Sequence, residues 1–293
     1  MNLFTKLTLL TASCISLNGF CADKVEEKSL DLDVQASFLY IGDAKFKDGL
    51  YKDKDLSYRT GRLMIGYTYE LDQERSIISG LGYQTDRFSW EENPAFSDTT
   101  YSNIIFQAGM STKEISNWYW KGILSVKLDS DLMNLQRAAI YNAALHGIYD
   151  YAENIDVHIG LLGTTGIRKD SILPILGLRY LKNDWTFSAV FPIDASVKYQ
   201  ISEKLAGALA YQPFYHRHRL GAEATVSRGI MEYRASGVKA EATYDYSEKV
   251  HLSASAGYNF GGDIKVRDEN GDNPRHYKFE STPFVGADVR IEI

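Results

Sequence analysis

Apolar and polar residues alternate with a period of two along much of the chain. In the C-terminal segment 285–293, VGADVRIEI, every charged residue occupies an even position and the odd positions are apolar. Segments 30–40, 118–128 and 250–260 show the same alternation. A period of two predicts β-strands with one apolar and one polar face.

These alternating segments are long. Many keep the pattern for about ten residues, the length that a tilted strand needs to cross a bilayer, whereas strands of soluble proteins average about five or six. Beyond the N-terminal region, no apolar run reaches the length of a transmembrane helix. The pattern therefore favours strands that span a membrane.

The expected connections alternate in length. Short polar turns are predicted at 71–74, 113–117, 152–154, 182–184, 202–204 and 247–249. Longer loops are predicted at 42–55, 90–98, 129–136, 213–228 and 261–276, with tighter links near 170–171 and 192–194. This arrangement predicts an all-β fold, a transmembrane antiparallel up-and-down β-barrel of about 14 strands, with 12 as the alternative. Both chain ends would then lie on the periplasmic side.

Aromatic residues gather at the two ends of the predicted strands, as expected at the two interfaces of a bilayer. Those beside short turns are Tyr67, Tyr69, Trp118, Trp120, Tyr149, Tyr151, Tyr180, Trp185, Phe187, Tyr199, Tyr244 and Tyr246. Those near longer links are Tyr40, Phe88, Tyr101, Phe191, Tyr211, Tyr258 and Phe260.

The N-terminal region has the features of a secretory signal peptide. Residues 1–22 carry one charge, Lys6, followed by a short apolar run and small residues. Cleavage after Cys21 or after Ala22 would leave 23–29 as a short periplasmic segment and 30–293 as the barrel. Both cysteines lie in the signal segment, so the mature chain would contain no thiol. Export and barrel together predict an integral protein of the cell outer membrane.

One stretch carries a family resemblance. Segments 173–180 (LPILGLRY) and 197–205 (VKYQISEKL), with Trp185 and Phe191-Pro192 between them, resemble part of uncharacterised, porin-like outer-membrane β-barrel proteins of Gram-negative-type bacteria. The resemblance implies fold and location, with outer-membrane lipid, lipopolysaccharide and the barrel-assembly machinery as partners, but no activity. Such barrels usually end in Phe or Trp, whereas this chain ends in Ile293.

Two short motifs resemble those of outer-membrane enzymes. His251 and Ser253 resemble the His-x-Ser pair of outer-membrane phospholipases, but their parity points both into the lumen. Asp156 and His158 resemble half of an outer-membrane protease site, whose partner would be the acidic segment 129–131. The topology places those two halves at opposite ends of the barrel, so no catalytic set is predicted.

Two pairs of histidines stand out. His216 and His218 alternate with Arg217 and Arg219 inside the predicted loop 213–228, and no third metal ligand is evident in the sequence. We therefore expect a solvated basic rim at 215–219 and no metal site. His146 and His158 are expected to hydrogen-bond inside the lumen.

The expected function is a porin-like channel for passive diffusion of small polar solutes. The alternatives are a lipid- or peptide-hydrolysing barrel and a structural or adhesive surface barrel. A lumen of about 14 strands should be wider than side chains can fill, and so water-filled. The net charge of −6, without a basic stripe, excludes nucleic acid as a partner, and no cofactor is predicted. The lumen-facing residues expected to set selectivity are Arg62, Lys121, Lys127, Arg179, Lys198, Lys239, Arg290, Asp288 and Glu241.

Overall fold

The computed structural model describes residues 30–47, 51–93, 99–115 and 117–293, so the predicted signal peptide and the segment 23–29 lie outside it. Within these residues the regular elements are β-strands, and no helix is long and apolar enough to span a membrane. The strands are β1 (Leu30–Lys45), β2 (Asp55–Glu70), β3 (Arg75–Trp90), β4 (Thr100–Thr112), β5 (Trp118–Asp129), β6 (Ala139–Ala152), β7 (Ile155–Gly166), β8 (Ser171–Lys182), β9 (Trp185–Phe191), β10 (Asp194–Ser202), β11 (Leu205–Arg219), β12 (Ile230–Ser247), β13 (Val250–Arg267), β14 (Arg275–Phe279) and β15 (Thr282–Glu292).

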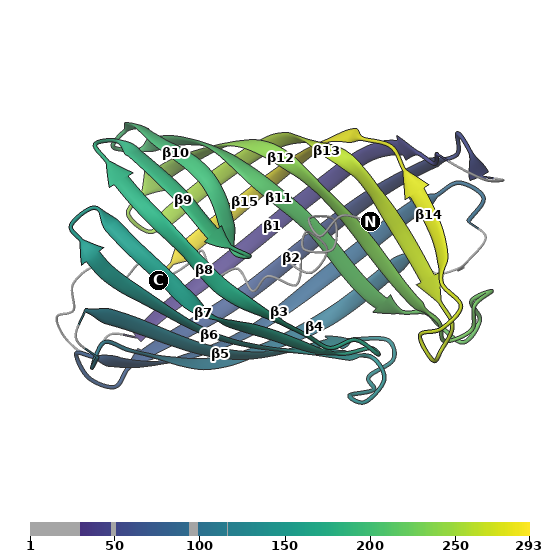
Figure 1. Cartoon of the computed structure of the whole chain (residues 1–293), viewed down its shortest axis with the longest axis horizontal. Coiled ribbons are helices and arrows are strands. Elements are labelled where there is room, and N and C mark those ends of the chain that lie inside the picture. The colour runs from purple at the N-terminus through teal and green to yellow at the C-terminus, as the bar shows by residue number, and fades with distance from the viewer. Residues whose placement is uncertain (1–29, 48–50, 94–98, 116) are drawn as a thin grey trace.

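The strands form a closed antiparallel barrel (Figure 1). Consecutive strands pair from β1 to β13, and β15 closes the ring by pairing with both β13 and β1. The short β14 is an extra strand: it extends the same edge of β13, pairing with 262–266, while β15 pairs with 250–259. The barrel therefore has 14 wall positions, and the predicted fold class is confirmed.

The connections alternate as the sequence predicts. We call the end with the turns 71–74, 113–117, 153–154, 183–184, 203–204 and 248–249 the turn end, and the opposite end the loop end. Two predicted loops are too long, because β11 continues to Arg219 and β13 to Arg267. Much of the predicted loops 213–228 and 261–276 is thus paired strand.

The outward face of the wall is apolar. On β3, Leu81 and Tyr83 are exposed outward, while Gln84 and Asp86, on positions of the other parity, are buried. Exposed aromatics such as Tyr69, Trp185 and Tyr246 lie beside the turns, as expected for an interfacial belt. Three aromatics predicted for the loop-end belt were placed wrongly. Tyr211 lines a cavity inside the barrel. Phe88 and Tyr101 are 0% and 3% exposed and point inward.

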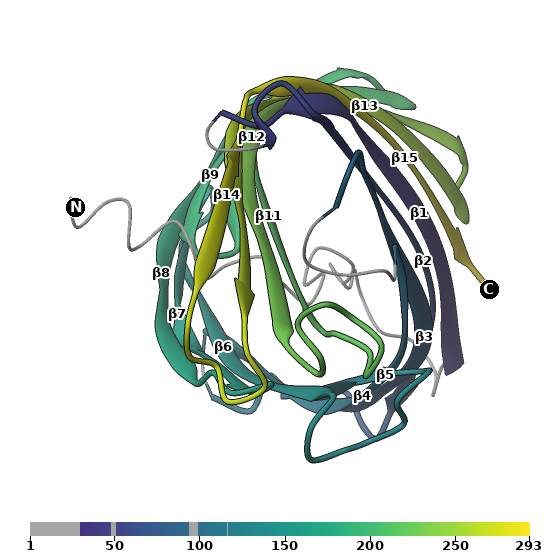
Figure 2. The same cartoon turned by 90° about the vertical axis from the view of Figure 1, so that its right-hand side faces the viewer.

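The wall is uneven near the loop end. β9 has seven residues, fewer than the about nine to eleven that a membrane-spanning strand needs. β10 pairs with β11 as far as Ala210, so the segment 211–219 of β11 pairs with β12 alone. Figure 2 shows this part of β11 passing through the inside of the barrel.

A bulge accompanies this inward course. The register between β12 and β13 shifts between Ala235 and Gly237, and opposite the shift Gly261 has a φ of +90°. A bulge bends its strand and increases the twist, and glycine adopts a positive φ without steric cost. The loop-end thirds of β12 and β13 can therefore turn away from the direction of the wall.

The outward apolar face should control insertion. Leu124, in the middle of β5, is 65% exposed. Leu124→Arg should destabilise the inserted barrel by about 2–4 kcal/mol, because it places a charge near the middle of the hydrocarbon. Met133→Arg is the control, since Met133 is 61% exposed but lies in the link after β5. Folding yield in lipid vesicles, read from the gel shift between unheated and heated samples, measures both. Equal yields would contradict a lipid-facing β5.

Candidate functional site

The inner face of the barrel carries the residues that the sequence assigns to the lumen. Arg62 lies directly opposite Gln84 on β3 and Ser37 on β1, and Asp288 lies opposite Ser253 on β13. Directly opposed residues of antiparallel strands project to the same face of the sheet. Five of the nine line one central cavity: Arg62, Lys127, Lys198, Lys239 and Glu241. The other four lie on the inner face nearer the turn end: Lys121, Arg179, Arg290 and Asp288.

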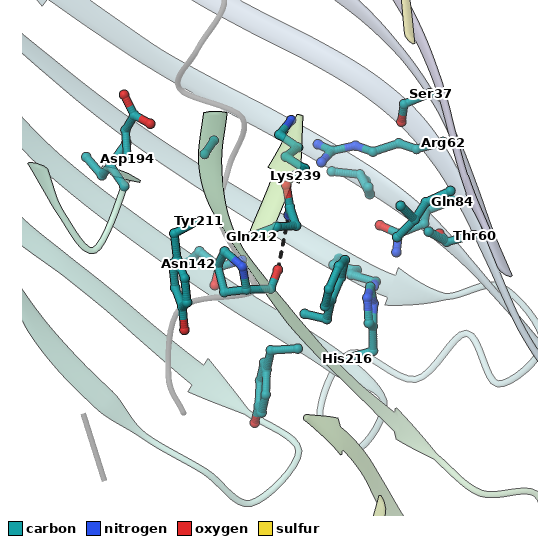
Figure 3. A pocket seen from close by; sticks show the side chains of 18 of the residues that line it. Ser37, Thr60, Arg62, Gln84, Asn142, Asp194, Tyr211, Gln212, His216 and Lys239 are labelled. Carbon is teal, nitrogen blue, oxygen red and sulfur yellow. Dashed lines mark hydrogen bonds between the residues drawn. The ribbon is translucent and has the colours of Figure 1, made fainter. Parts of the chain in front are cut away.

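The central cavity has a volume of about 480 Å³. In Figure 3, Ser37, Arg62 and Gln84 reach it from one side of the view and Asp194 and Tyr211 from the other. Most of these groups are polar, and the volume is ample for water molecules. The cavity thus offers hydrogen-bonding groups to a small polar molecule from opposite walls of the barrel.

The inner face toward the turn end is a network of paired polar groups. Arg179 binds Asp156 with both Nε and Nη2, and Arg290 Nε lies 3.1 Å from Asp33 Oδ1. His146 Nε2 lies 3.0 Å from His158 Nδ1, so the expected lumen hydrogen bond between these histidines is present. Pairing lowers the cost of charge away from bulk water. This part of the lumen is held by ion pairs.

The two enzyme-like motifs do not assemble into catalytic sites. His251 Nδ1 lies 2.6 Å from Asp245 Oδ1, but the Ser253 hydroxyl is hydrogen-bonded to the Thr243 hydroxyl at 3.0 Å. A serine nucleophile needs a hydrogen bond to its base. Asp156 and His158, which resemble half of a protease site, are also bound to other partners. Asp156 pairs with Arg179, and His158 pairs with His146. Asp129 is hydrogen-bonded at the loop end to the backbone N–H groups of residues 131 and 132.

The loop-end half of the lumen is closed by packed side chains. On β11, Phe214 and Tyr215 are 3% and 6% exposed although they point to opposite faces. On β12, each of the four residues 230–233 is buried. A wall strand buries one face against the lumen and exposes the other, so these segments lie inside the barrel. The prediction of a lumen too wide for side chains to close is wrong for this half.

Aromatic rings join the inner segments to the opposite wall. Tyr233 on β12 stacks on Tyr58 of β2 with ring centroids 5.0 Å apart and lies 5.5 Å from Phe88 of β3. His218 on β11 stacks on Tyr101 of β4 at 4.5 Å. Since β11 and β12 are not neighbours of β2, β3 or β4 in the wall, these contacts cross the lumen. We call this set, with the apolar residues packed around it, the aromatic core.

A buried polar cluster lies next to the aromatic core. Asp86 on β3 is 0% exposed and accepts hydrogen bonds from the Tyr58 hydroxyl at 2.7 Å and from Gln84 Nε2 at 2.9 and 3.0 Å. His216 Nδ1 and His218 Nε2 lie 3.5 and 3.2 Å from its two oxygens. The prediction of a solvated basic rim at 215–219 is therefore wrong, because these residues belong to β11 and are packed inside the barrel.

The other face of the same β11 segment carries arginines. Arg217 is 2% exposed, and its Nε and Nη1 make no hydrogen bond to a described residue. Glu232 on β12 pairs with Arg234 and, at 3.3 Å, with Arg267. Lys169, in the link after β7, donates to the Tyr215 hydroxyl at 3.1 Å, and burial lowers its pKa to about 8. Positive groups outnumber negative ones on this side of the inner segment.

The sequence does contain a sign that the inner parts of β11 and β12 are strands. Phe214, His216 and His218 continue the alternation of β11 past Pro213, and 230–233 reads Ile-Met-Glu-Tyr, which is strand-like rather than loop-like. Counting 213–219 as strand would have shortened the predicted loop by nearly half. Nothing local in the sequence joins Asp86 to His216, since 130 positions separate them and the contact depends on the inward course of β11.

Comparison with known proteins identifies the fold. No protein-family model matches the chain. An uncharacterized protein of Chlamydia pneumoniae is 24% identical over 269 residues, 86% of this chain and 84% of that protein. One of Chlamydia trachomatis serovar D is 23% identical over 273 residues, 88% of this chain and 85% of that protein. An outer-membrane channel from Pseudomonas putida F1 has a similar structure, with a TM-score of 0.51, 10% identity and coverage of 92% of this chain and 97% of that one. The resemblance to outer-membrane β-barrels is thereby confirmed at the level of the fold.

The aromatic core should contribute much of the stability of the loop end. Phe88→Ala should lower the free energy of unfolding by about 3–5 kcal/mol, because a fully buried ring leaves a cavity. Phe106→Ala is the matched control, since Phe106 on β4 is 50% exposed on the outward face. Urea titration of the barrel in lipid vesicles measures both variants. Equal losses would contradict a packed core across the lumen.

Proposed function

We propose that this protein is a porin-like diffusion channel of the outer membrane for small polar solutes, with a preference for anions. The observation that carries the proposal is the central cavity, which is polar, charged and enclosed by a closed 14-position barrel. Pore walls of this kind select solutes through the charge and hydrogen-bonding groups that line them. We also propose that residues 1–22 form a signal peptide that is cleaved. The barrel then contacts lipopolysaccharide and the barrel-assembly machinery.

The lining charges favour anions. Five cationic groups and two carboxylates line the cavity: Arg62, Lys127, Lys198, Arg217, Lys239, Asp194 and Glu241. Lys239 is paired with Glu241, so part of the charge is internally neutralised. In a confined space inside a protein, an excess of charge of one sign raises the local concentration of oppositely charged solutes. The preference arises because other carboxylates of the inner face, such as Asp33 and Asp156, lie outside the cavity and are paired with arginines.

The aromatic core separates the cavity from the loop end, so conduction requires the inner segments of β11 and β12 to move. These segments are continuous with the wall, and β12 pairs with β13 through a bulge opposite Gly261. The channel then opens when the inner segments of β11 and β12 move from their packed position to a displaced one, and the two positions are in equilibrium. We propose no enzymatic activity, because Ser253 and His251 bind separate partners.

The barrier can be tested by weakening it. Wild-type protein in planar bilayers should show rare, brief openings, and Tyr233→Ala should raise the open probability at least tenfold, because the ring of Tyr233 contacts Tyr58 and Phe88 across the lumen. Leu209→Ala is the control, since Leu209 on β11 is 66% exposed outward. The gel shift on heating verifies that each variant is folded. Absence of conductance in both wild type and Tyr233→Ala at any voltage would refute the channel.

Selectivity gives a second test. Lys198→Glu, measured in the Tyr233→Ala background, should shift the reversal potential in a salt gradient toward cations, because Lys198 lines the cavity. Lys204→Glu changes the net charge equally but lies in the exposed turn after β10 and should leave the potential nearly unchanged. Equal shifts in the two variants would show that conduction does not pass through the cavity.

A further inference from the structure

Three potential metal ligands meet where the inner segment of β11 touches β3. Asp86, His216 and His218 each present a ligand atom, and these atoms lie within 4.8 Å of one another. Asp86 and His218 are 0% and 1% exposed. The two histidines are two positions apart on one strand, so both project to the same face, and the carboxylate approaches them from across the lumen.

The hydrogen bonds of the Tyr58 hydroxyl favour a cation between His216 Nδ1 and Asp86 Oδ1. The Tyr58 hydroxyl donates its proton to Asp86 Oδ1 at 2.7 Å, so at 2.8 Å it accepts the proton of His216 Nε2. In the neutral imidazole, Nδ1 then carries a lone pair. That lone pair lies 3.5 Å from Asp86 Oδ1, another acceptor. Two facing acceptors repel unless a positive charge lies between them.

His218 adds an independent observation. Its Nδ1 makes no hydrogen bond to any described residue, and its Nε2 lies 3.2 Å from Asp86 Oδ2 outside the geometry of a well-formed hydrogen bond. Buried polar groups are nearly always satisfied, so a buried imidazole without hydrogen bonds calls for an explanation. Coordination of a metal ion through Nε2 would satisfy it, with the ring held in place by stacking on Tyr101.

The donor set and spacing fit zinc. Tetrahedral zinc sites combine histidine nitrogens and carboxylate oxygens at about 2.0–2.1 Å from the metal, which places neighbouring ligand atoms about 3.3 Å apart. His216 Nδ1 lies 3.5 Å from Asp86 Oδ1 and His218 Nε2 lies 3.2 Å from Asp86 Oδ2, close to such an edge. The three ligand atoms lie within 4.8 Å of one another, so the side chains draw together when they bind an ion. His216 also lines the central cavity, so a water molecule can occupy the fourth position.

We propose that Asp86, His216 and His218 form a binding site for a divalent transition-metal ion of the zinc class, and that the bound ion fastens the inner segment of β11 to β3. Tyr58 acts as a positioning residue, because its hydroxyl orients both His216 and Asp86. Lys127 Nζ, 3.6 Å from Asp86 Oδ2, is the competing cation that balances the carboxylate when no metal is bound.

Metal binding can be measured without reference to channel activity. Untagged protein, folded in detergent and treated with EDTA, is titrated with Zn²⁺ by calorimetry, and the bound metal is counted by mass spectrometry after gel filtration. We expect one ion per chain. Asp86→Asn and His218→Ala should each weaken binding at least tenfold, whereas His276→Ala should not, although His276 Nδ1 also lies 2.8 Å from a carboxylate, that of Asp263. Lys127→Met should tighten binding by removing the competing charge.

Two further measurements separate a built site from adventitious zinc. Co²⁺ in place of Zn²⁺ should give the visible absorption of a four-coordinate ion in wild type and lose it in His218→Ala. Zn²⁺ should raise the temperature of the gel shift in wild type but not in His218→Ala. No uptake by wild type at 100-fold molar excess of Zn²⁺, or equal uptake in wild type, Asp86→Asn and His218→Ala, overturns the site. Uptake with an unchanged gel-shift temperature overturns the fastening of β11.

Discussion

A β-sheet inside a membrane must leave no backbone N–H or C=O group facing hydrocarbon, and much of this structure follows from that constraint. The β9–β10 hairpin is short, so β8 lacks a partner on one side along 171–175 and β11 lacks one along 211–219. Two free strand edges in a wall would expose polar backbone to lipid. The chain places the free part of β11 inside the barrel, beside a cavity large enough for water.

Once part of the wall lies inside, the lumen acquires a core of the kind found in soluble proteins. Tyr58, Phe88 and Tyr233 are each 0–1% exposed and touch one another although they come from opposite sides of the ring. Aromatic rings bury large apolar areas and hold defined geometries. The barrel therefore combines a lipid-facing apolar surface outside, an ion-paired lumen toward the turn end, and a packed core toward the loop end.

The sequence predicted the wall well and the interior poorly, for one physical reason. A strand such as 285–293 shows its two environments directly, because lipid and lumen select opposite polarity at alternate positions. His216 and Arg217 alternate too, but both sides of their segment are buried among protein groups, so their polarity resembles that of a solvated loop. Asp86 could be assigned to the inner face by parity, yet two of its partners, His216 and His218, reach it only because β11 passes through the inside of the barrel.

The part of β11 that lies inside the barrel differs from a separate plug domain in its attachment to the wall. Because the inner part of β11 is continuous with the wall and paired to β12 along its whole length, it cannot be deleted, cleaved off or exchanged while the barrel is kept intact. Each substitution that eases passage through the loop end also removes packing from the barrel itself. In the channel that we propose, permeability and the stability of the barrel are therefore coupled, so that one cannot be raised by substitution without lowering the other.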